Sequence, residues 1–471
     1  MTARSAAWAL GALLAAAACF YGVVWPGAPF EEPDSAGYLE IAADLQAHGG
    51  LSRVWSRPPG YPLLLVATGS APTPGRTLYA TQLALHLVAV GLLWIALGRA
   101  GARPALRTAF AALALLPPFV EHAAFTLTES LAQLQLVLGI AGTFVWIRGG
   151  GAGWLVAACL AVGSALLVHP TYAVASPTLA LGIAALCLLP CTAPNLRSRI
   201  LRASMALIVA FGVGSGGFLV HNAARFGYVG VSPMLGIVLS HKTGRVLERI
   251  PEEHAAVREI LIRARNELLV RRDGDHLAYA YVFQALPALR RETGLDDVAL
   301  DRLLTRLQLG LIARSPLEYG DEVGRSLLWY FSPGVSDFAA FGSGALKGLW
   351  HLVRAGVLAL FAGTLALLAG PAWLLLAARR REGAAAPPLP PGLAASCGFL
   401  ALGAAVVGAE ALTASALTSA VWRMRVPVDL VILACALLGA QTFRALAAHV
   451  RVTPVTPRLG EAADGRKVRS G

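Results

Sequence analysis

Long apolar runs recur along this sequence and restrict the folds that are open to it. Hydrophobic residues make up 56% of the chain and charged residues only 14%, whereas a soluble protein carries about 25% charged residues. Several runs reach the roughly 20 residues that span a bilayer as a helix. Their continuous hydropathy does not fit the alternating pattern of a membrane β-barrel. The sequence therefore predicts an all-α, polytopic membrane helical bundle.

The apolar runs also divide the chain into segments. A membrane module over 1–222 contains a first outer loop at 26–62, and a polar segment over 223–345 has the pattern of a helical outer cap. Further membrane helices follow over 346–450, and the tail at 451–471 is polar. We expect ten spans, at approximately 8–25, 77–98, 104–119, 126–147, 153–168, 171–190, 199–221, 348–377, 392–412 and 427–446.

The distribution of arginines predicts which loops face the cytoplasm, because cytoplasmic loops carry an excess of Lys and Arg. With an inner N-terminus, every inner loop is basic, while the 223–343 segment has 15 basic and 15 acidic residues. Topology thus explains the net charge of +12 without nucleic-acid binding. We expect both termini in the cytoplasm and the acidic first loop outside. The inner basic residues are Arg99, Arg103, Arg107, Arg148, Arg197, Arg199, Arg202, Arg379, Arg380, Arg381, Arg466, Lys467 and Arg469.

The first outer loop concentrates charge just after the first span. Asp34 starts a short segment, 34–48, with an apolar stripe that favours a helix lying on the membrane surface. Arg57 follows, and the prolines after it stop any helix. Asp34 is either a helix N-cap, a role typical of aspartate, or a functional carboxylate near positive backbone N–H groups.

Two further groups of ionisable residues are candidates for a site. Glu129 lies just inside the outer end of the fourth span, where ionisable residues usually face the bundle interior and mark function. Alternatively, Glu129 is exposed to water at the membrane interface. This second interpretation applies more strongly to Glu121 and His122, which lie nearer the water. Arg423 and Arg425 precede the last span on the outer side, where they could bind phosphate or snorkel to lipid headgroups.

No metal motif stands out in the sequence. Asp273 and Asp275 flank Gly274 in a pattern typical of a polar turn, and two carboxylates are too few to fix a metal. We expect no cofactor, although a divalent metal stays open. Gly212 begins a Gly-x-Gly-x-x-Gly run inside an apolar span, which indicates close helix packing rather than a nucleotide site.

The candidate residues lie in motifs that resemble a known family. Asp34-Ser-Ala-Gly-Tyr38 and Arg57-Pro-Pro-Gly-Tyr61 resemble the first outer loop of the GT-C membrane glycosyltransferases. The similar group is related to protein O-mannosyltransferases and aminoarabinose transferase (glycosyltransferase family 39-like). Three later motifs also resemble this group in the same order: Thr126-Leu-Thr-Glu129-Ser, His169-Pro-Thr and Arg423-Met-Arg425-Val-Pro-Val.

The resemblance implies an enzyme of the bacterial inner (plasma) membrane with its active site facing outward. Such enzymes transfer a sugar from a polyprenyl-phosphate donor to a glycan, lipid or protein acceptor and invert the anomeric centre. By this resemblance Asp34 is the base or acceptor-positioning group, Glu129 is the second acid, and Arg423 or Arg425 binds the donor phosphate. The other expected substrate-binding residues are Tyr38, Arg57, Tyr61, Glu121, His122, His169 and Lys242.

The sequence departs from the family pattern at two motif positions. His169 stands where the family usually has arginine, and Met424 stands where it has tyrosine. Two other classes of protein stay open: a non-catalytic membrane scaffold of the same fold, and a transporter or flippase of a lipid-linked glycan. Transporters often contain repeated halves and broken helices, and the sequence shows no repeat.

Overall fold

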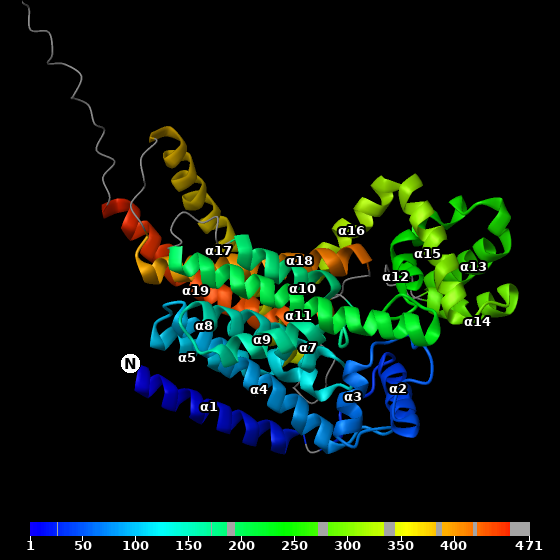
Figure 1. The fold of residues 1–471 in the computed structure, drawn as a ribbon, viewed down its shortest axis with the longest axis horizontal. Coiled ribbons are helices and arrows are strands. Elements are labelled where there is room, and N and C mark those ends of the chain that lie inside the picture. Colours follow the sequence, from blue (N-terminus) through cyan, green and yellow to red (C-terminus); the bar gives the residue numbers. More distant parts are fainter. Residues whose placement is uncertain are drawn as a thin grey trace, which may run out of the picture.

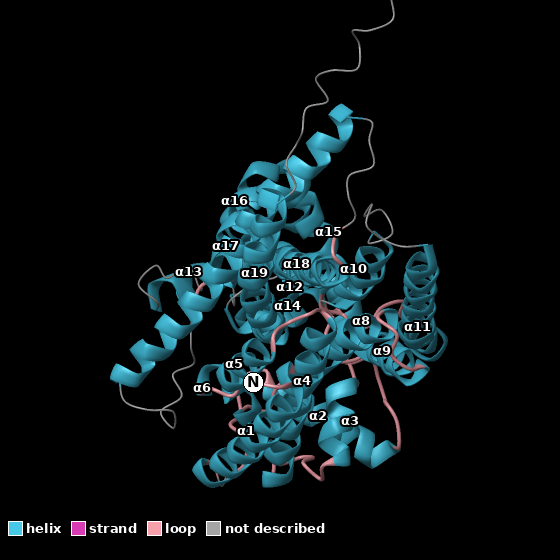
Figure 2. Ribbon diagram, turned by 90° about the vertical axis from the view of Figure 1, so that its left-hand side faces the viewer, coloured by secondary structure: helices cyan, strands magenta, loops and turns pink. Residues whose placement is uncertain are grey.

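The structure, a computed structural model, describes residues 1–25, 27–170, 172–185, 194–271, 281–333, 344–382, 389–417 and 422–452. Helices dominate these ranges, as predicted (Figure 2). Within them no β-strand forms, and the only extended pairing is a single bridge between Phe30 and Phe125. The Asp273–Asp275 turn, the end of the 171–190 span and nearly all of the 451–471 tail lie outside the described residues.

The bundle contains the apolar helices in the order that the sequence predicts (Figure 1). The expected fourth span is one continuous helical segment, since α7 passes through a π-helical turn (Leu138–Gly142) into α8. The bundle helices are α1 (Ala3–Val24), α4 (Arg76–Arg99), α5 (Pro104–Ala114), α6 (Pro117–Val120), α7 (Glu129–Val137), α8 (Thr143–Ile147), α9 (Ala152–Ala165), α10 (Tyr172–Ala185), α11 (Pro194–Phe226), α17 (Gly344–Glu382), α18 (Pro391–Leu417) and α19 (Val426–Val452).

Seven of the described helical segments are long and apolar enough to cross a membrane, so the chain is a multi-pass membrane protein. Three of the ten expected spans correspond to shorter helices. The expected 104–119 span is broken, because Pro117 and Pro118 end α5 and start the short α6. Within the described ranges, α9 and α10 have 14 residues each.

Helix α19 lies at the centre of the bundle and packs against α17, α18 and α7 (Figure 1). Every residue from Arg425 to Ala436 is buried. The glycine run of α11 packs as predicted at one position, because a Cβ on Gly214 would collide with the backbone of Gly163 in α9. Around Gly212 and Gly216 the same helix has open space.

The outer segment forms a helical cap with an interior of its own. Residues of α12, α13, α14 and α15 build an apolar cluster that includes Leu261, Leu289 and Leu304 and is separate from the bundle core. This cluster gives the cap a core that is distinct from the core of the bundle. The cap helices are α12 (Leu235–Thr243), α13 (Ala255–Arg271), α14 (Tyr281–Thr293), α15 (Asp297–Arg314) and α16 (Pro316–Tyr330).

The first outer loop and the cap lie at the same end of the bundle, opposite the N-terminus (Figure 1). The loop contains α2 (Ser35–His48) and α3 (Gly60–Ala67). The cap is fixed to the bundle through α16, where the Tyr319 hydroxyl donates to the Ala416 carbonyl of α18 at 3.0 Å. The first loop and the cap were predicted to lie on the same side of the bundle, and their position at one end agrees with that part of the prediction.

Candidate functional site

Backbone hydrogen bonds join the two acidic motifs, although about 90 residues separate them in sequence. The Phe30 N–H donates to the Ala124 carbonyl (2.7 Å), and the Thr126 N–H donates to the Phe30 carbonyl (2.8 Å). The Ser35 hydroxyl, at the start of α2, donates to the Thr126 carbonyl (2.9 Å). These bonds place the segment that begins with Asp34 directly beside the segment that leads to Glu129.

Asp34 pairs with Arg57, its neighbour on the same outer loop. Arg57 Nη2 donates to Asp34 Oδ1 at 2.6 Å, and the two side chains are 25% and 34% exposed, respectively. Asp34 immediately precedes α2, but its carboxylate makes no hydrogen bond to the helix N-terminus. The N-cap alternative is therefore wrong for this side chain, which instead meets a guanidinium at a solvent-accessible position.

Two buried tyrosines lie beside this pair and beside Glu129. The rings of Tyr38 and Tyr61 meet edge to face with centroids 5.2 Å apart, and the Arg57 guanidinium lies 5.4 Å from the Tyr38 ring centroid. Burial raises the pKa of both tyrosines, and the negative charge of Glu129 raises it further. Glu129, at the N-terminus of α7, thus belongs to the same group of side chains.

Gln82 of α4 holds this arrangement in register. The Tyr61 hydroxyl donates to Gln82 Oε1 at 2.9 Å, and Gln82 Nε2 donates to the Ala123 and Phe125 carbonyls at 2.9 Å. Gln82 is fully buried, so each of its bonds replaces a lost bond to water. One side chain therefore links α3, α4 and the loop before Glu129.

The end of α9 reaches the same region. The Gly60 N–H at the start of α3 donates to the Leu167 carbonyl at 2.6 Å, and a Cβ on Gly60 would lie 2.6 Å from that oxygen. His169 follows two residues later and is half-buried. Only glycine allows this close approach of α3 and α9, and the approach brings the His169 motif next to the Arg57 motif.

The cap contributes Lys242 and His241 from α12. Lys242 is buried and donates to the Ser326 hydroxyl of α16. Burial lowers its pKa to about 8, although Glu322 opposes this shift. Burial and the Lys242 charge lower the pKa of His241 to about 3, while Asp34 acts in the opposite direction. The Asp34 carboxylate is therefore close enough to α12 to act electrostatically on His241.

Glu121 and His122 are buried in the bundle interior and are not exposed to water at the membrane interface, which was the alternative that the sequence left open. Arg354 of α17 donates to Glu121 Oε1 at 3.0 Å, and both side chains are buried. The His122 ring meets the buried His86 ring edge to face at 5.2 Å. Burial, together with the charges of His86 and Arg354, holds the pKa of His122 well below its usual value.

Arg425 is also internal, which differs from the exposed, phosphate-facing position expected from the sequence. It is 1% exposed, and its Nε donates to Asp429 Oδ1 at 2.6 Å. Its Nη1 donates to the carbonyls of Tyr330 (2.6 Å) and Ser332 (2.8 Å) at the end of α16. Arg425 therefore anchors the cap to the start of α19. The side chain of Arg423 lies outside the described residues.

Sequence reasoning missed Arg354 and Asp429, which complete a buried network of two arginines and two carboxylates. Arg354 Nη2 lies 3.9 Å from Asp429 Oδ2, so the network joins Glu121 to Arg425 through these two residues. Two signals were available in the sequence. Arg354 is an ionisable residue within an apolar span, and Asp429 follows Arg425 at the i, i+4 spacing of a helical ion pair.

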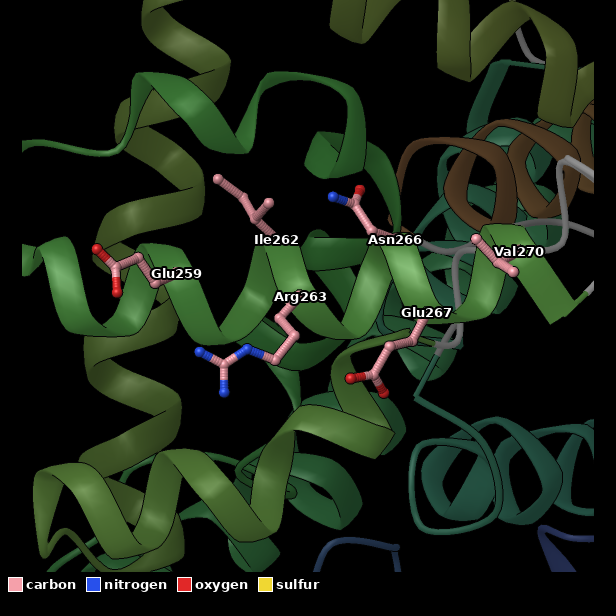
Figure 3. Close-up of a pocket in the computed structure, with 6 residues that line it drawn as sticks. All are labelled: Glu259, Ile262, Arg263, Asn266, Glu267 and Val270. Atoms are coloured by element: carbon pink, nitrogen blue, oxygen red, sulfur yellow. The ribbon is translucent and has the colours of Figure 1, made fainter.

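The described residues contain no metal cluster, and the groove along α13 lies away from the predicted site residues. No group of three His, Cys, Asp or Glu side chains there could hold a metal ion. A shallow, open groove of about 660 Å³ runs along α13, and none of the predicted site residues lines it (Figure 3). Its lining residues are Glu259, Ile262, Arg263, Asn266, Glu267 and Val270.

No protein-family profile and no curated protein sequence matches this chain. Among solved structures, it is similar to ArnT from Cupriavidus metallidurans in the apo state (TM-score 0.38, 16% identity, 93% of this chain and 78% of that chain). The match to ArnT bound to undecaprenyl phosphate has a TM-score of 0.37 and 16% identity, over 94% of this chain and 78% of that chain.

A third match is the archaeal oligosaccharyltransferase AglB from Archaeoglobus fulgidus in complex with an inhibitory peptide and a dolichol-phosphate (TM-score 0.48, 13% identity, 96% of this chain and 53% of that chain). ArnT and AglB are GT-C membrane glycosyltransferases, the superfamily that the sequence motifs resemble. All three TM-scores are below 0.5, and the function proposed below rests on the residues of the site.

Proposed function

We propose that the chain is a membrane glycosyltransferase that transfers a sugar from a polyprenyl-phosphate donor to an acceptor at the end of the bundle that carries α2, α3 and the cap. The observation that carries the proposal is the Asp34–Arg57 pair. A carboxylate and a guanidinium meet there at 2.6 Å in a partly exposed position, beside buried tyrosines and a second carboxylate. The other charged cluster in the described bundle, formed by Glu121, Arg354, Arg425 and Asp429, is closed to solvent, whereas the Asp34–Arg57 pair is partly exposed.

In the proposed reaction, Asp34 acts as the general base. Its carboxylate takes the proton from an acceptor hydroxyl or amine, and the acceptor atom forms a bond to the anomeric carbon of the sugar. The bond from that carbon to the phosphate oxygen breaks, and polyprenyl phosphate leaves with the electron pair. Attack opposite to the leaving phosphate inverts the anomeric centre.

Arg57 has the properties needed to stabilise the leaving phosphate. A guanidinium carries five N–H donors in a planar fork, and the bond to Asp34 uses one of them. The remaining donors can bind phosphate oxygens while the pair with Asp34 keeps the side chain in place. A fixed positive charge at the leaving group is usually a large part of catalysis.

Lys242 is a second candidate for the phosphate, since it lies on the cap helix that reaches toward Asp34. Because its pKa is about 8, Lys242 is only partly charged near pH 8, and a nearby phosphate would favour its charged form. Arg425 is unsuitable in the described arrangement, because its side chain is 1% exposed and three internal acceptors already bind it. We therefore assign to Arg57, with Lys242 as the second candidate, the phosphate-binding role that the resemblance implied for Arg423 or Arg425.

The partial exposure of Asp34 also bears on the choice between an enzyme and a non-catalytic scaffold. A sealed or occupied space beside Asp34 would support the interpretation that the chain is a scaffold without activity. The carboxylate is instead 34% exposed, which leaves room for an acceptor to approach.

The test is transfer of radiolabelled sugar from a panel of polyprenyl-phosphate sugars, with purified protein in nanodiscs and membrane extract as acceptor. Asp34→Asn should lower transfer by roughly 10²- to 10⁴-fold, as expected for loss of a general base, with unchanged expression. Glu40→Gln is the matched control, because Glu40 is an exposed carboxylate on the same helix. Near-normal transfer by Asp34→Asn would contradict the assignment, and no transfer from any donor by intact protein would favour the scaffold.

A further inference from the structure

The loop between α2 and α3 determines where Arg57 lies. Helix α2 ends at His48, and Gly49 closes it in the left-handed conformation (φ 66°). The chain must then return toward the start of α2, where Arg57 meets Asp34. Ten helical residues separate Asp34 from Asp44, a distance of about 15 Å along the axis, so the loop has to be held over its whole length.

Asp44, near the end of α2, is a buried carboxylate that binds this loop. Its Oδ2 accepts from the Ser52 backbone N–H and from Trp55 Nε1, both at 2.9 Å. Its Oδ1 lies 2.9 Å from His48 Nδ1. The Asp44 side chain is 7% exposed, so a single carboxylate organises three groups from the helix end and the loop.

The indole ring whose N–H donates to Asp44 also has a guanidinium over its face. The Arg53 guanidinium lies 3.9 Å from the centroid of the Trp55 ring, a cation–π contact. Trp55 precedes Arg57 by two residues, and the buried Pro58 and Pro59 follow. Fixing the indole ring therefore fixes the backbone immediately before Arg57.

From these contacts we propose that Asp44 is a positioning residue that holds the α2–α3 loop so that Arg57 reaches Asp34. The loop has few other restraints between Gly49 and Trp55, where Ser52 and Arg53 are exposed. Hydrogen bonds to an ionised carboxylate are about twice as strong as neutral ones. The consequence for donor binding depends on the proposed function, whereas the ordering of the loop does not.

The ionisation of Asp44 fits this role. Burial by itself raises the pKa of Asp44, but the hydrogen bonds from Ser52 and Trp55 and the neighbouring His48 outweigh burial and lower it. Asp44 is therefore ionised at neutral pH, and the bonds lose strength only when acid protonates the carboxylate.

The first experiment measures backbone hydrogen–deuterium exchange by mass spectrometry in a peptide that covers residues 50–57, with the full chain in nanodiscs. Asp44→Ala should raise the exchange rate there by about tenfold or more, because a charge-assisted bond to a backbone N–H is lost. Asp44→Asn should give exchange between wild type and Asp44→Ala, since the amide carbonyl can still accept from both loop donors but without the charge that strengthens the bonds. Glu40→Ala is the matched control on the same helix.

A second variant protects the test against a folding failure of Asp44→Ala. Trp55→Phe removes the indole N–H and keeps an aromatic ring beneath Arg53, so it should give intermediate exchange over residues 50–57. Exchange in α13 of the cap should be unchanged in every variant that is folded. Unchanged exchange over residues 50–57 in Asp44→Ala would overturn the inference.

The second experiment measures binding of undecaprenyl phosphate to the same variants. Asp44→Ala should weaken binding about tenfold, and Asp44→Asn should restore part of it, which a general loss of stability would not do. If wild-type protein does not bind undecaprenyl phosphate while the exchange pattern holds, the proposed function fails and the positioning role of Asp44 stands. Equal binding by Asp44→Ala and wild type would refute the link between Asp44 and Arg57.

Discussion

Replacing Arg425 with Met tests whether this arginine is an internal anchor or a ligand of phosphate. The substitution leaves the buried Asp429 carboxylate with Arg354 at 3.9 Å, and it removes the donor to the Tyr330 and Ser332 carbonyls. Breaking a buried ion pair costs roughly 3–5 kcal/mol, and a buried carbonyl that loses its donor costs roughly 1–3 kcal/mol. These costs overlap, so we expect a loss of about 4 kcal/mol.

This loss can be expressed as a change in melting temperature. With an unfolding entropy of roughly 2.1 cal/mol/K per residue, 471 residues give roughly 1 kcal/mol/K. If the chain unfolds in one step, Arg425→Met should therefore lower Tm by roughly 4 °C. The assay is thermal unfolding of detergent-purified protein, followed by circular dichroism. Arg306→Met, at an exposed position on the cap, is the control.

A double variant separates the loss of the pair from the loss of side-chain volume. Arg425→Met combined with Asp429→Leu removes one positive and one negative charge and leaves Arg354 paired with Glu121. The double variant should be more stable than the sum of the two single changes predicts, by about 1–3 kcal/mol. Normal Tm with weakened binding of undecaprenyl phosphate in Arg425→Met would refute the anchor role and restore the role in phosphate binding.

Two further predictions concern the cap and the bundle. Because the pKa of Lys242 is about 8, its ammonium is present below pH 8 and is lost above it. Binding of undecaprenyl phosphate, measured from pH 6 to pH 9, should therefore weaken as pH rises through 8, and the same titration of Lys242→Met should be flatter. Gly214→Leu should lower Tm by collision with α9, whereas Gly216→Leu, which points into open space, should not; equal Tm values for the two would contradict the packing.

The charged residues at this end of the bundle form two groups, the proposed site and the buried network, with different roles. Asp34 and Arg57 come from the first loop and are partly exposed, so a ligand could meet them. Arg354 and Asp429 belong to a closed set whose two positive and two negative charges balance. Because a buried charge is stable only when it is paired, the closed set has little capacity left for a ligand.

The sequence allowed the site residues to be predicted in part. The sequence placed Asp34 and Arg57 as candidates in one loop, and only the structure showed that the two side chains meet. The sequence could not predict whether the side chains of Glu121 and Arg425 face water or the bundle interior. Both residues lie at the end of a span, where one helical turn separates the two environments. His241 and Asp44 were missed, since their contacts come from packing between elements.

The sequence by itself determined that the chain is a helical membrane bundle. Apolar runs of span length leave the backbone no other way to satisfy its hydrogen bonds in lipid. Only the tertiary structure decided which charges meet. Phe30 pairs with the loop before Glu129, Gly60 lets α3 touch α9, and Arg425 turns inward to the end of α16. These contacts join residues far apart in the chain, and their geometry depends on how whole helices pack, which no local pattern records.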